Sequence, residues 1–218
     1  MHPYNKTLLL LCIIIATGLL CSASAVRADA YEDMLKAVAG GNVLVIQSLL
    51  AKGVDVDSTD RAGTTLLMLA ASQGQLAAAK ALLDAKAKVN ARNQYGESAL
   101  MLAAIQGHRP VVDYLLANGA EVNPPGWTPL MFAAVRGHAH IAKLLLAKGA
   151  NINASSENGT TALMLAAKDG NLDTVLLLLE HGAAVNLRNL AGATALGMAL
   201  DGGRKNVATV LLRAGAEQ

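Results

Sequence analysis

Residues 158–183 read NGTTALMLAAKDGNLDTVLLLLEHGA, and the same pattern recurs along the chain. Each copy has a glycine, a hydroxyl residue, an apolar run, a second glycine and a second apolar run that ends in a leucine pair. The first glycines of the copies are spaced by 33, 30, 33 and 33 residues, and they are Gly63, Gly96, Gly126, Gly159 and Gly192. A period near 33 residues predicts a stacked array, because one unit cannot bury its apolar face alone.

Each unit is predicted to contain two antiparallel helices that are joined at the second glycine. A hydroxyl side chain before the first helix can accept hydrogen bonds from its free N–H groups, and the residues at this position are Thr65, Ser98, Thr128, Thr161 and Thr194. Pro129 and Pro110 lie in the first turns of helices, where a missing N–H costs nothing. Most second helices should end at a left-handed glycine, at Gly53, Gly119, Gly149, Gly182 and Gly215.

The composition favours a core of small aliphatic side chains, since 53% of the residues are hydrophobic but only 3% are aromatic. Alanine and leucine combine high helix propensity with close packing. The net charge of +2 gives no electrostatic basis for binding nucleic acid, which calls for a clustered basic face. We therefore predict closely packed helices and no nucleic-acid partner.

Residues 1–30 have the layout of a secretory signal peptide. Lys6 precedes an uninterrupted apolar run over 8–15, and small residues follow from Cys21. Two Ala-x-Ala sites predict cleavage after Ala25 or after Ala30, which leaves a domain of residues 31–218 in the periplasm or outside the cell. The apolar stretch is short for a membrane span, so none is expected after cleavage; the alternative is an uncleaved N-terminal anchor.

Residues suited to catalysis or metal binding are sparse. Cys12 and Cys21 both lie in the predicted signal, so the mature chain would have no disulfide and no cysteine chemistry. Motifs for nucleotide binding or a serine nucleophile do not occur. His138 and His140 are too few ligands for a zinc site, while His108 and His138 follow second glycines and are expected to serve turns and packing. We predict no catalytic residue, no metal and no cofactor, and hence no enzyme.

The repeated motif, as in TTLLMLAA at 64–71 and TTALMLAA at 160–167, resembles the ankyrin repeat, whose signature is Thr-Pro-Leu-His-x-Ala at this spacing. The resemblance covers residues 31–218. It implies an all-α ankyrin-repeat solenoid of about six repeats, made of helix-turn-helix units with β-hairpin fingers. The end repeats should be atypical, as a finite stack requires.

The chain departs from the family pattern in three ways. Methionine replaces the signature histidine in four units, and it is not expected to supply the hydrogen bonds of the imidazole ring. Lys86 stands where other units have the helix-ending glycine, which predicts local strain. The connection from Asn123 to Gly126 contains Pro124–Pro125 and is three residues short, so one finger should be truncated.

The resemblance implies that partners contact the fingers and the exposed side of the inner helices. Carried over position by position, the predicted partner-binding residues are Arg61, Gln73, Tyr95, Glu97, Gln106, Trp127, Arg136, Glu157, Lys168 and Asp169. Other residues at the finger and inner-helix positions that the family uses for binding are Thr64, Ser72, Ile105, Val135, Asn158 and Thr160.

Trp127 is the only tryptophan and follows the glycine of the truncated finger. Aromatic residues and arginine are the usual energetic anchors of protein interfaces, so Trp127, Tyr95 and Arg136 could form a central hot spot. The alternative is that Trp127 packs over Pro124–Pro125 and replaces the missing residues.

The resemblance suggests a monomeric protein-binding module of the bacterial periplasm that acts by surface complementarity. Similar exported ankyrin proteins suggest an accessory to oxidative-stress defence or an inhibitor of a toxic enzyme. The alternative is a self-associating structural or envelope-organising protein. Leu176 is apolar at a position where the other units are polar, so it is expected to be exposed on the convex back.

Overall fold

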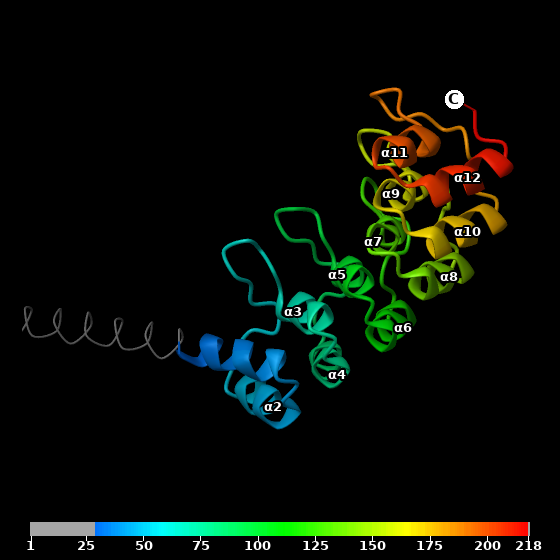
Figure 1. The fold of residues 1–218 in the computed structure, drawn as a ribbon. Helices are drawn as coiled ribbons and strands as arrows, with labels where there is room; N and C mark the ends of the chain where they lie inside the picture. The colour runs from blue at the N-terminus through cyan, green and yellow to red at the C-terminus, as the bar shows by residue number, and fades with distance from the viewer. Residues whose placement is uncertain (1–28, 218) are drawn as a thin grey trace, which may run out of the picture.

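The computed structural model describes residues 29–217 (Figure 1). Predicted cleavage after Ala25 lies outside the described residues. Ala30 lies within them, in a helix over 29–39, where it packs against the core. None of the helices in residues 29–217 is both long and apolar enough to cross a membrane.

The described helices form two parallel rows, as Figure 1 shows. The inner row continues from the helix over 29–39 through α3 (Leu66–Ser72), α5 (Ala99–Gln106), α7 (Pro129–Val135), α9 (Ala162–Asp169) and α11 (Ala195–Asp201). The outer row consists of α2 (Val43–Ala51), α4 (Leu76–Asp84), α6 (Arg109–Ala117), α8 (Ala139–Ala147), α10 (Leu172–Glu180) and α12 (Lys205–Arg213). From α3 to α9 each inner helix contacts the next inner helix, and from α3 to α11 each contacts its own outer helix. The predicted helical solenoid of about six repeats is confirmed.

The core is a continuous cluster that runs through the stack between the two rows. Alanine pairs in the inner helices, such as Ala103–Ala104 and Ala133–Ala134, are fully buried where α5 packs on α7. Their small side chains allow the helix backbones to approach closely, and leucines of the outer helices, such as Leu115 and Leu145, fill the remaining space. This packing explains a core that is rich in aliphatic and poor in aromatic residues.

The predicted N-caps are confirmed in every inner helix from α3 to α11, where the hydroxyl oxygen accepts from the backbone N–H three residues later. Each such cap contributes about 1 kcal/mol. The expectation for the methionines is partly wrong, because the Sδ atoms of Met68, Met101 and Met164 accept from the N–H of the cap residue at 3.4, 3.4 and 3.5 Å. The thioether is a weak acceptor, but it completes a capping box in these three units.

The outer helices end as the sequence predicts. Gly53, Gly119, Gly149, Gly182 and Gly215 all have positive φ. Lys86 occupies the corresponding position with φ of 70°, and it is the one non-glycine residue with positive φ in the described part of the chain. The side chain therefore strains the backbone at the end of α4.

The predicted fingers precede the inner helices and project to one side of the stack (Figure 1). We number them finger 1 (59–65), finger 2 (92–98), finger 3 (124–128), finger 4 (155–161) and finger 5 (188–194). Within residues 29–217 their strand pairing is limited to the isolated bridges Thr59–Thr65 and Ser155–Thr161. The fingers are thus hairpin-shaped loops rather than a sheet.

Residues after the second glycines join neighbouring repeats. The Nε2 atoms of His108 and His138 lie 3.1 Å from the backbone oxygens of Ser72 and Ile105 in the preceding inner helices. Asn171 donates to Val135 O at 2.9 Å in the same way. The turn and packing roles expected for both histidines are confirmed.

Candidate functional site

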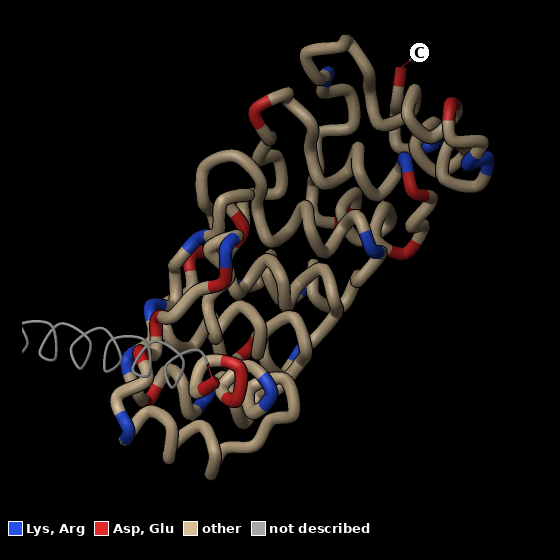
Figure 2. Tube along the Cα trace, turned by 90° about the vertical axis from the view of Figure 1, so that its left-hand side faces the viewer, with Lys and Arg blue, Asp and Glu red and all other residues tan. Residues whose placement is uncertain are grey.

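The fingers and the exposed ends of the inner helices form one side of the stack, which we call the finger face. Figure 2 is turned toward this side and shows lysines and arginines mixed with aspartates and glutamates along it. Nine of the ten predicted partner-binding residues are exposed, and Glu97 is partly buried. Thr160 is buried, so the expectation that its side chain faces a partner is wrong.

The ten residues are spread over four repeats, from Arg61 in finger 1 to Asp169 at the end of α9. The structure brings three of them together at one pocket, namely Tyr95, Glu97 and Trp127. Arg136 is exposed at the end of α7 but does not line this pocket. The centre of the finger face is therefore the place where the predicted residues converge.

Finger 3 is truncated, as predicted. The segment between α6 and α7 covers 118–128, three residues fewer than the segment over 85–98 between α4 and α5. Backbone bonds join finger 1 to finger 2, through Gln94 N to Ala62 O, and finger 4 to finger 5, through Leu190 N to Asn158 O, both at 2.9 Å. Among the hydrogen bonds of residues 29–217, none joins the backbone of finger 3 to a neighbouring finger.

The finger glycines show the same gap. A Cβ atom on Gly63 or Gly159 would lie 3.5 or 3.1 Å from the backbone of the following finger. A Cβ on Gly96 or Gly126 would meet no atom of residues 29–217 within 4 Å, apart from the two chain neighbours of each glycine. The row of fingers is thus open on both sides of finger 3.

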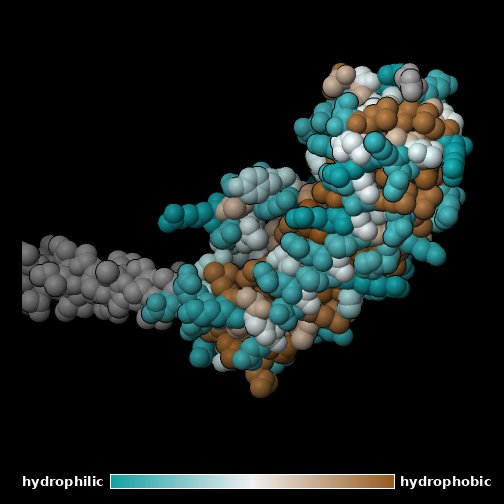
Figure 3. All heavy atoms as spheres, in the orientation of Figure 1, coloured by the Kyte–Doolittle hydropathy of each residue, from teal (hydrophilic) through white to brown (hydrophobic). Residues whose placement is uncertain are grey.

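An apolar pocket of about 340 Å³ lies at this gap, and we call it the central pocket. Its lining residues come from finger 2, α5, finger 3 and α7, and they are Tyr95, Gly96, Glu97, Met101, Ile105, Trp127, Phe132 and Val135. Figure 3 shows apolar surface in the recess between finger 2 and α7.

The aromatic side chains of the central pocket are unusual for this chain. Trp127 and Phe132 are its only tryptophan and its only phenylalanine. Their rings pack edge to face with centroids 5.5 Å apart, while 43% of Trp127 and 72% of Tyr95 remain exposed. Trp127 therefore contacts its own inner helix and still presents a large surface to solvent.

Sequence reasoning missed Phe132 and Met101 as pocket residues. Met101 is buried at a position that is methionine in four units, and Phe132 occupies an apolar position that packs against the core. A signal was present for Phe132, because it is the one aromatic ring at a position that is otherwise leucine or methionine.

A second apolar pocket, of about 390 Å³, lies where the first inner helix meets finger 1 and α3. Tyr31 and Asp60 both line it. Burial, followed by the negative charges of Asp60 and Glu32, raises the pKa of Tyr31 above its ordinary value. Hydrogen bonds from Thr64, foremost its backbone N–H, and from the N–H of Ala62 lower the pKa of the Asp60 carboxyl.

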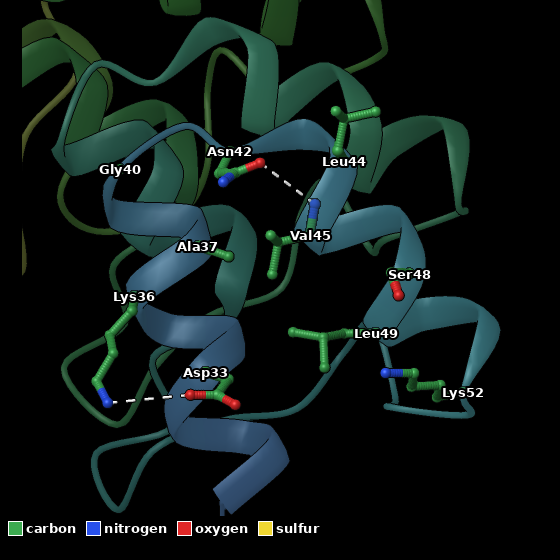
Figure 4. Close-up of a pocket in the computed structure, with 10 residues that line it drawn as sticks. All are labelled: Asp33, Lys36, Ala37, Gly40, Asn42, Leu44, Val45, Ser48, Leu49 and Lys52. Atoms are coloured by element: carbon green, nitrogen blue, oxygen red, sulfur yellow. Dashed lines mark hydrogen bonds and ion pairs between the residues drawn. The ribbon is translucent and has the colours of Figure 1, made fainter.

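A wider hollow of about 700 Å³ lies at the end of the stack, between the helix over 29–39 and α2 (Figure 4). Charged side chains, among them the pair Lys36 and Asp33 with atoms 4.0 Å apart, stand at its edge. Leu44 on α2 is 79% exposed beside it, and Figure 3 shows apolar surface near this end of α2.

His138 and His140 are the two histidines considered as metal ligands. The rings of His138 and His140 have centroids 5.9 Å apart. The part of the chain that the structure describes contains no group of three or more His, Cys, Asp or Glu residues placed to hold a metal ion.

Comparisons with known proteins agree with this architecture. A family model described as ankyrin repeats in three copies matches residues 34–125, 90–156 and 130–218. The crystal structure of the human ASB11 ankyrin repeat domain is similar to this chain, with 31% sequence identity, 84% of each chain covered and a TM-score of 0.78. No curated protein matches the chain.

Proposed function

Because the chain belongs to the ankyrin-repeat family, we propose that it binds another protein through the finger face. Ankyrin repeats are generally protein-binding modules, and a stack of repeats presents a long surface whose framework is fixed while its rim side chains vary. In this proposal the chain acts by surface complementarity to its partner, without a cofactor and without turnover of a substrate.

The observation that carries this proposal is the exposed aromatic pair at the central pocket. Tyr95 and Trp127 stand at the centre of the finger face, and both lie against apolar surface. Interface hot spots are enriched in tryptophan and tyrosine and lie near the centre of an interface. Of the two roles considered for Trp127, the exposed ring at the pocket supports that of a binding anchor.

We further propose export to the bacterial periplasm or beyond, which rests on the signal-like residues 1–30 and the absence of cysteine after Cys21. In that compartment the protein would be an accessory to oxidative-stress defence or an inhibitor of a toxic enzyme. N-terminal sequencing of the exported protein tests the location, with Val26 or Tyr31 expected first. An intact Met1 on exported protein would contradict it.

The binding proposal is tested by affinity capture from native extract, with the processed protein carrying a C-terminal tag. The test variant combines Trp127→Ala with Tyr95→Ala and alters the central pocket. The matched control is Leu190→Ala, which removes an 82% exposed side chain on finger 5. A stoichiometric partner that is lost only with the aromatic double variant supports the proposal. A partner that all variants retain would place the binding site away from the centre of the finger face.

A second candidate function is self-association, which the exposed leucines favour. Leu44 is exposed at one end of the stack, Leu200 and Leu212 are exposed on the last repeat, and Leu176 on α10 is 38% exposed as expected. Sedimentation equilibrium over a hundredfold range of concentration tests this candidate. Association that Leu44→Asp or Leu176→Asp abolishes supports it, whereas a constant monomer mass contradicts it.

A further inference from the structure

We propose that the central pocket takes one large apolar side chain of the partner, next to a lysine or arginine that pairs with Glu97. This inference rests on the proposed function and specifies the chemistry that the partner must present.

The central pocket is large enough for one large side chain, with a volume of about 340 Å³. The floor is formed by Ile105, Phe132 and Val135, which are only partly buried. A leucine, methionine or phenylalanine side chain would cover this floor and remove apolar surface from water.

The apolar floor is particular to this part of the finger face. Ile105 and Val135 stand at a position where α3 has Ser72, α9 has Lys168 and α11 has Asp201. The two apolar residues are neighbours across α5 and α7, directly under the gap left by finger 3. The shortened finger and the apolar floor therefore coincide in one place, as a recognition pocket requires.

The negative charge of Glu97 favours a lysine or arginine next to the apolar side chain that the partner inserts. It is the one charged residue in the lining, and its Oε2 accepts from Asn93 Nδ2 at 2.8 Å. Within residues 29–217, no lysine, arginine or histidine nitrogen lies within 4.0 Å of its carboxylate. A partly buried carboxylate beside apolar surface gains from a cation that the partner brings.

The aromatic rings reinforce the same preference. The exposed faces of Tyr95 and Trp127 border the pocket. A lysine or arginine over such a ring gains a further cation–π attraction. The partner segment is therefore a basic one that carries a single large apolar residue.

The test uses the fluorescence of Trp127, which is the only tryptophan and so reports on the pocket alone. The probes are acetylated pentapeptides with Leu, Phe or Ala at the centre, flanked on both sides by Lys or by Glu. The full chain is titrated with each probe up to about 10 mM. We expect a saturable blue shift with the Lys-flanked Leu or Phe peptides, with at least tenfold tighter binding than the Ala-centred or Glu-flanked peptides.

Three variants separate the pocket from the rest of the finger face. Val135→Lys and Ile105→Ser introduce residues that α9 and α3 carry at the same position, so the fold should tolerate them. Both variants should weaken binding of the Lys-flanked, Leu-centred peptide at least tenfold. Glu97→Gln should keep binding but reduce the preference for Lys over Glu flanks to less than threefold.

The inference is overturned if the Ala-centred or Glu-flanked peptides bind as tightly, if Val135→Lys binds normally, or if no probe shifts the emission. These outcomes differ from failure of the proposed function. A captured partner that depends on other residues of the finger face would leave the function standing and remove this inference alone.

Discussion

Thr174 is a buried hydroxyl residue whose Oγ1 has no hydrogen-bond partner in the described structure. The equivalent residues of other outer helices are apolar, for example Val111 in α6 and Val207 in α12. A buried polar group without a partner costs about 1–3 kcal/mol. The site in α10 therefore carries a local defect that its neighbours in the stack lack.

We predict that Thr174→Val raises the free energy of unfolding by about 1 kcal/mol, because valine has the same shape without the unsatisfied hydroxyl. Equilibrium denaturation in urea measures the change. Thr209→Val is the matched control, since the Thr209 hydroxyl is exposed and donates to Lys205 O at 2.9 Å. A gain of the same size in both variants, or no gain in Thr174→Val, would show that burial without a partner is not the cause.

Asp60 holds the turn of finger 1 through its carboxylate. Its Oδ1 accepts from the N–H groups of Ala62 and Thr64, both at 2.8 Å. These bonds, with that of the Thr64 backbone the largest cause, lower the pKa of Asp60 in the folded state. A lowered pKa means that the carboxylate stabilises the fold above its unfolded value of about 3.9, and that this contribution is lost as pH falls through the folded pKa.

We predict that finger 1 loosens at acidic pH and that Asp60→Asn removes this dependence. Asn93 and Asn189 make the same turn in fingers 2 and 5 through an uncharged oxygen, so the asparagine variant should keep the finger. Amide exchange at Thr64, followed by NMR from pH 5 down to pH 2 and corrected for intrinsic rates, measures the effect. Equal pH dependence in the wild type and the variant would contradict the role of the carboxylate.

At the scale of the element, an asparagine in each connecting loop joins it to the next loop. Asn90 donates from Nδ2 to Gly119 O at 3.0 Å and accepts from Glu121 N at 2.8 Å. Asn123 and Asn186 make the same two bonds to their neighbours. Asn153 makes only the second bond, from Ala184 N at 2.9 Å. The residue type itself changes once, at Asp57, whose carboxylate accepts from Lys88 N at 2.9 Å but cannot donate.

An asparagine at position 57 would donate to the backbone carbonyl of Lys86, as Asn90 does to that of Gly119. The two exceptions, an aspartate for asparagine and a lysine for glycine, therefore fall on the same joint between repeats. The ion pair of Asp57 with Lys88, at 3.3 Å, replaces little of the loss, because Lys88 is largely exposed to water. The contact between the loop of Asp57 and the loop of Lys86 is therefore the weakest of these loop–loop connections.

We predict that Lys86→Gly stabilises the protein by about 1 kcal/mol, because glycine adopts positive φ without the steric cost of a Cβ. Lys52→Gly is the control, since Lys52 ends α2 with φ of −81° and glycine has no advantage there. Thermal and urea unfolding of both variants provide the measurement. If Lys52→Gly gains as much stability as Lys86→Gly, the left-handed backbone is not the source of the effect.

The elements could be predicted from the sequence because their signals are local. Thr65 and its equivalents precede apolar runs, glycines mark the turns, and counting residues between Gly96 and Gly126 reveals the short finger. The central pocket could not be predicted in full. Phe132 lines the pocket because fingers 2 and 3 meet α5 and α7 there, and the methionine sulfur as a cap acceptor has no sequence signature.

At the scale of the whole molecule, the finger row consists of two bonded pairs with finger 3 between them. Fingers 1 and 2 share a backbone bond, and so do fingers 4 and 5. The inner helices nonetheless continue without a break, and α5 and α7 pack on each other across the gap. The helical rows thus keep the stack in one piece, while the missing finger contacts leave the central pocket open for a partner.

The stability of such a stack is approximately a sum of unit terms and nearest-neighbour terms. A unit at the end of the described stack, with one neighbour and a weak joint, should open at lower free energy than interior units. The helix over 29–39 and α2 form such a unit. Besides the packing of α2 on α4 and the exposed Asp57–Lys88 ion pair, it is joined to the following repeats by the Asp57 hydrogen bond and by a bond from Gln75 Nε2 to Ala39 O at 2.8 Å.

We predict that amides of α2 exchange faster than those of α5 and α7, and that the variant Asp57→Asn with Lys86→Gly slows α2 several-fold. The added amide donor and the relaxed backbone strengthen only the joint that α2 must break, so exchange in α12 should stay unchanged. Hydrogen exchange followed by mass spectrometry resolves these segments. Uniform exchange along the wild-type stack would mean that it opens as one cooperative unit, and slowing in α2 and α12 alike would mean that the variant acts on global stability rather than on the joint.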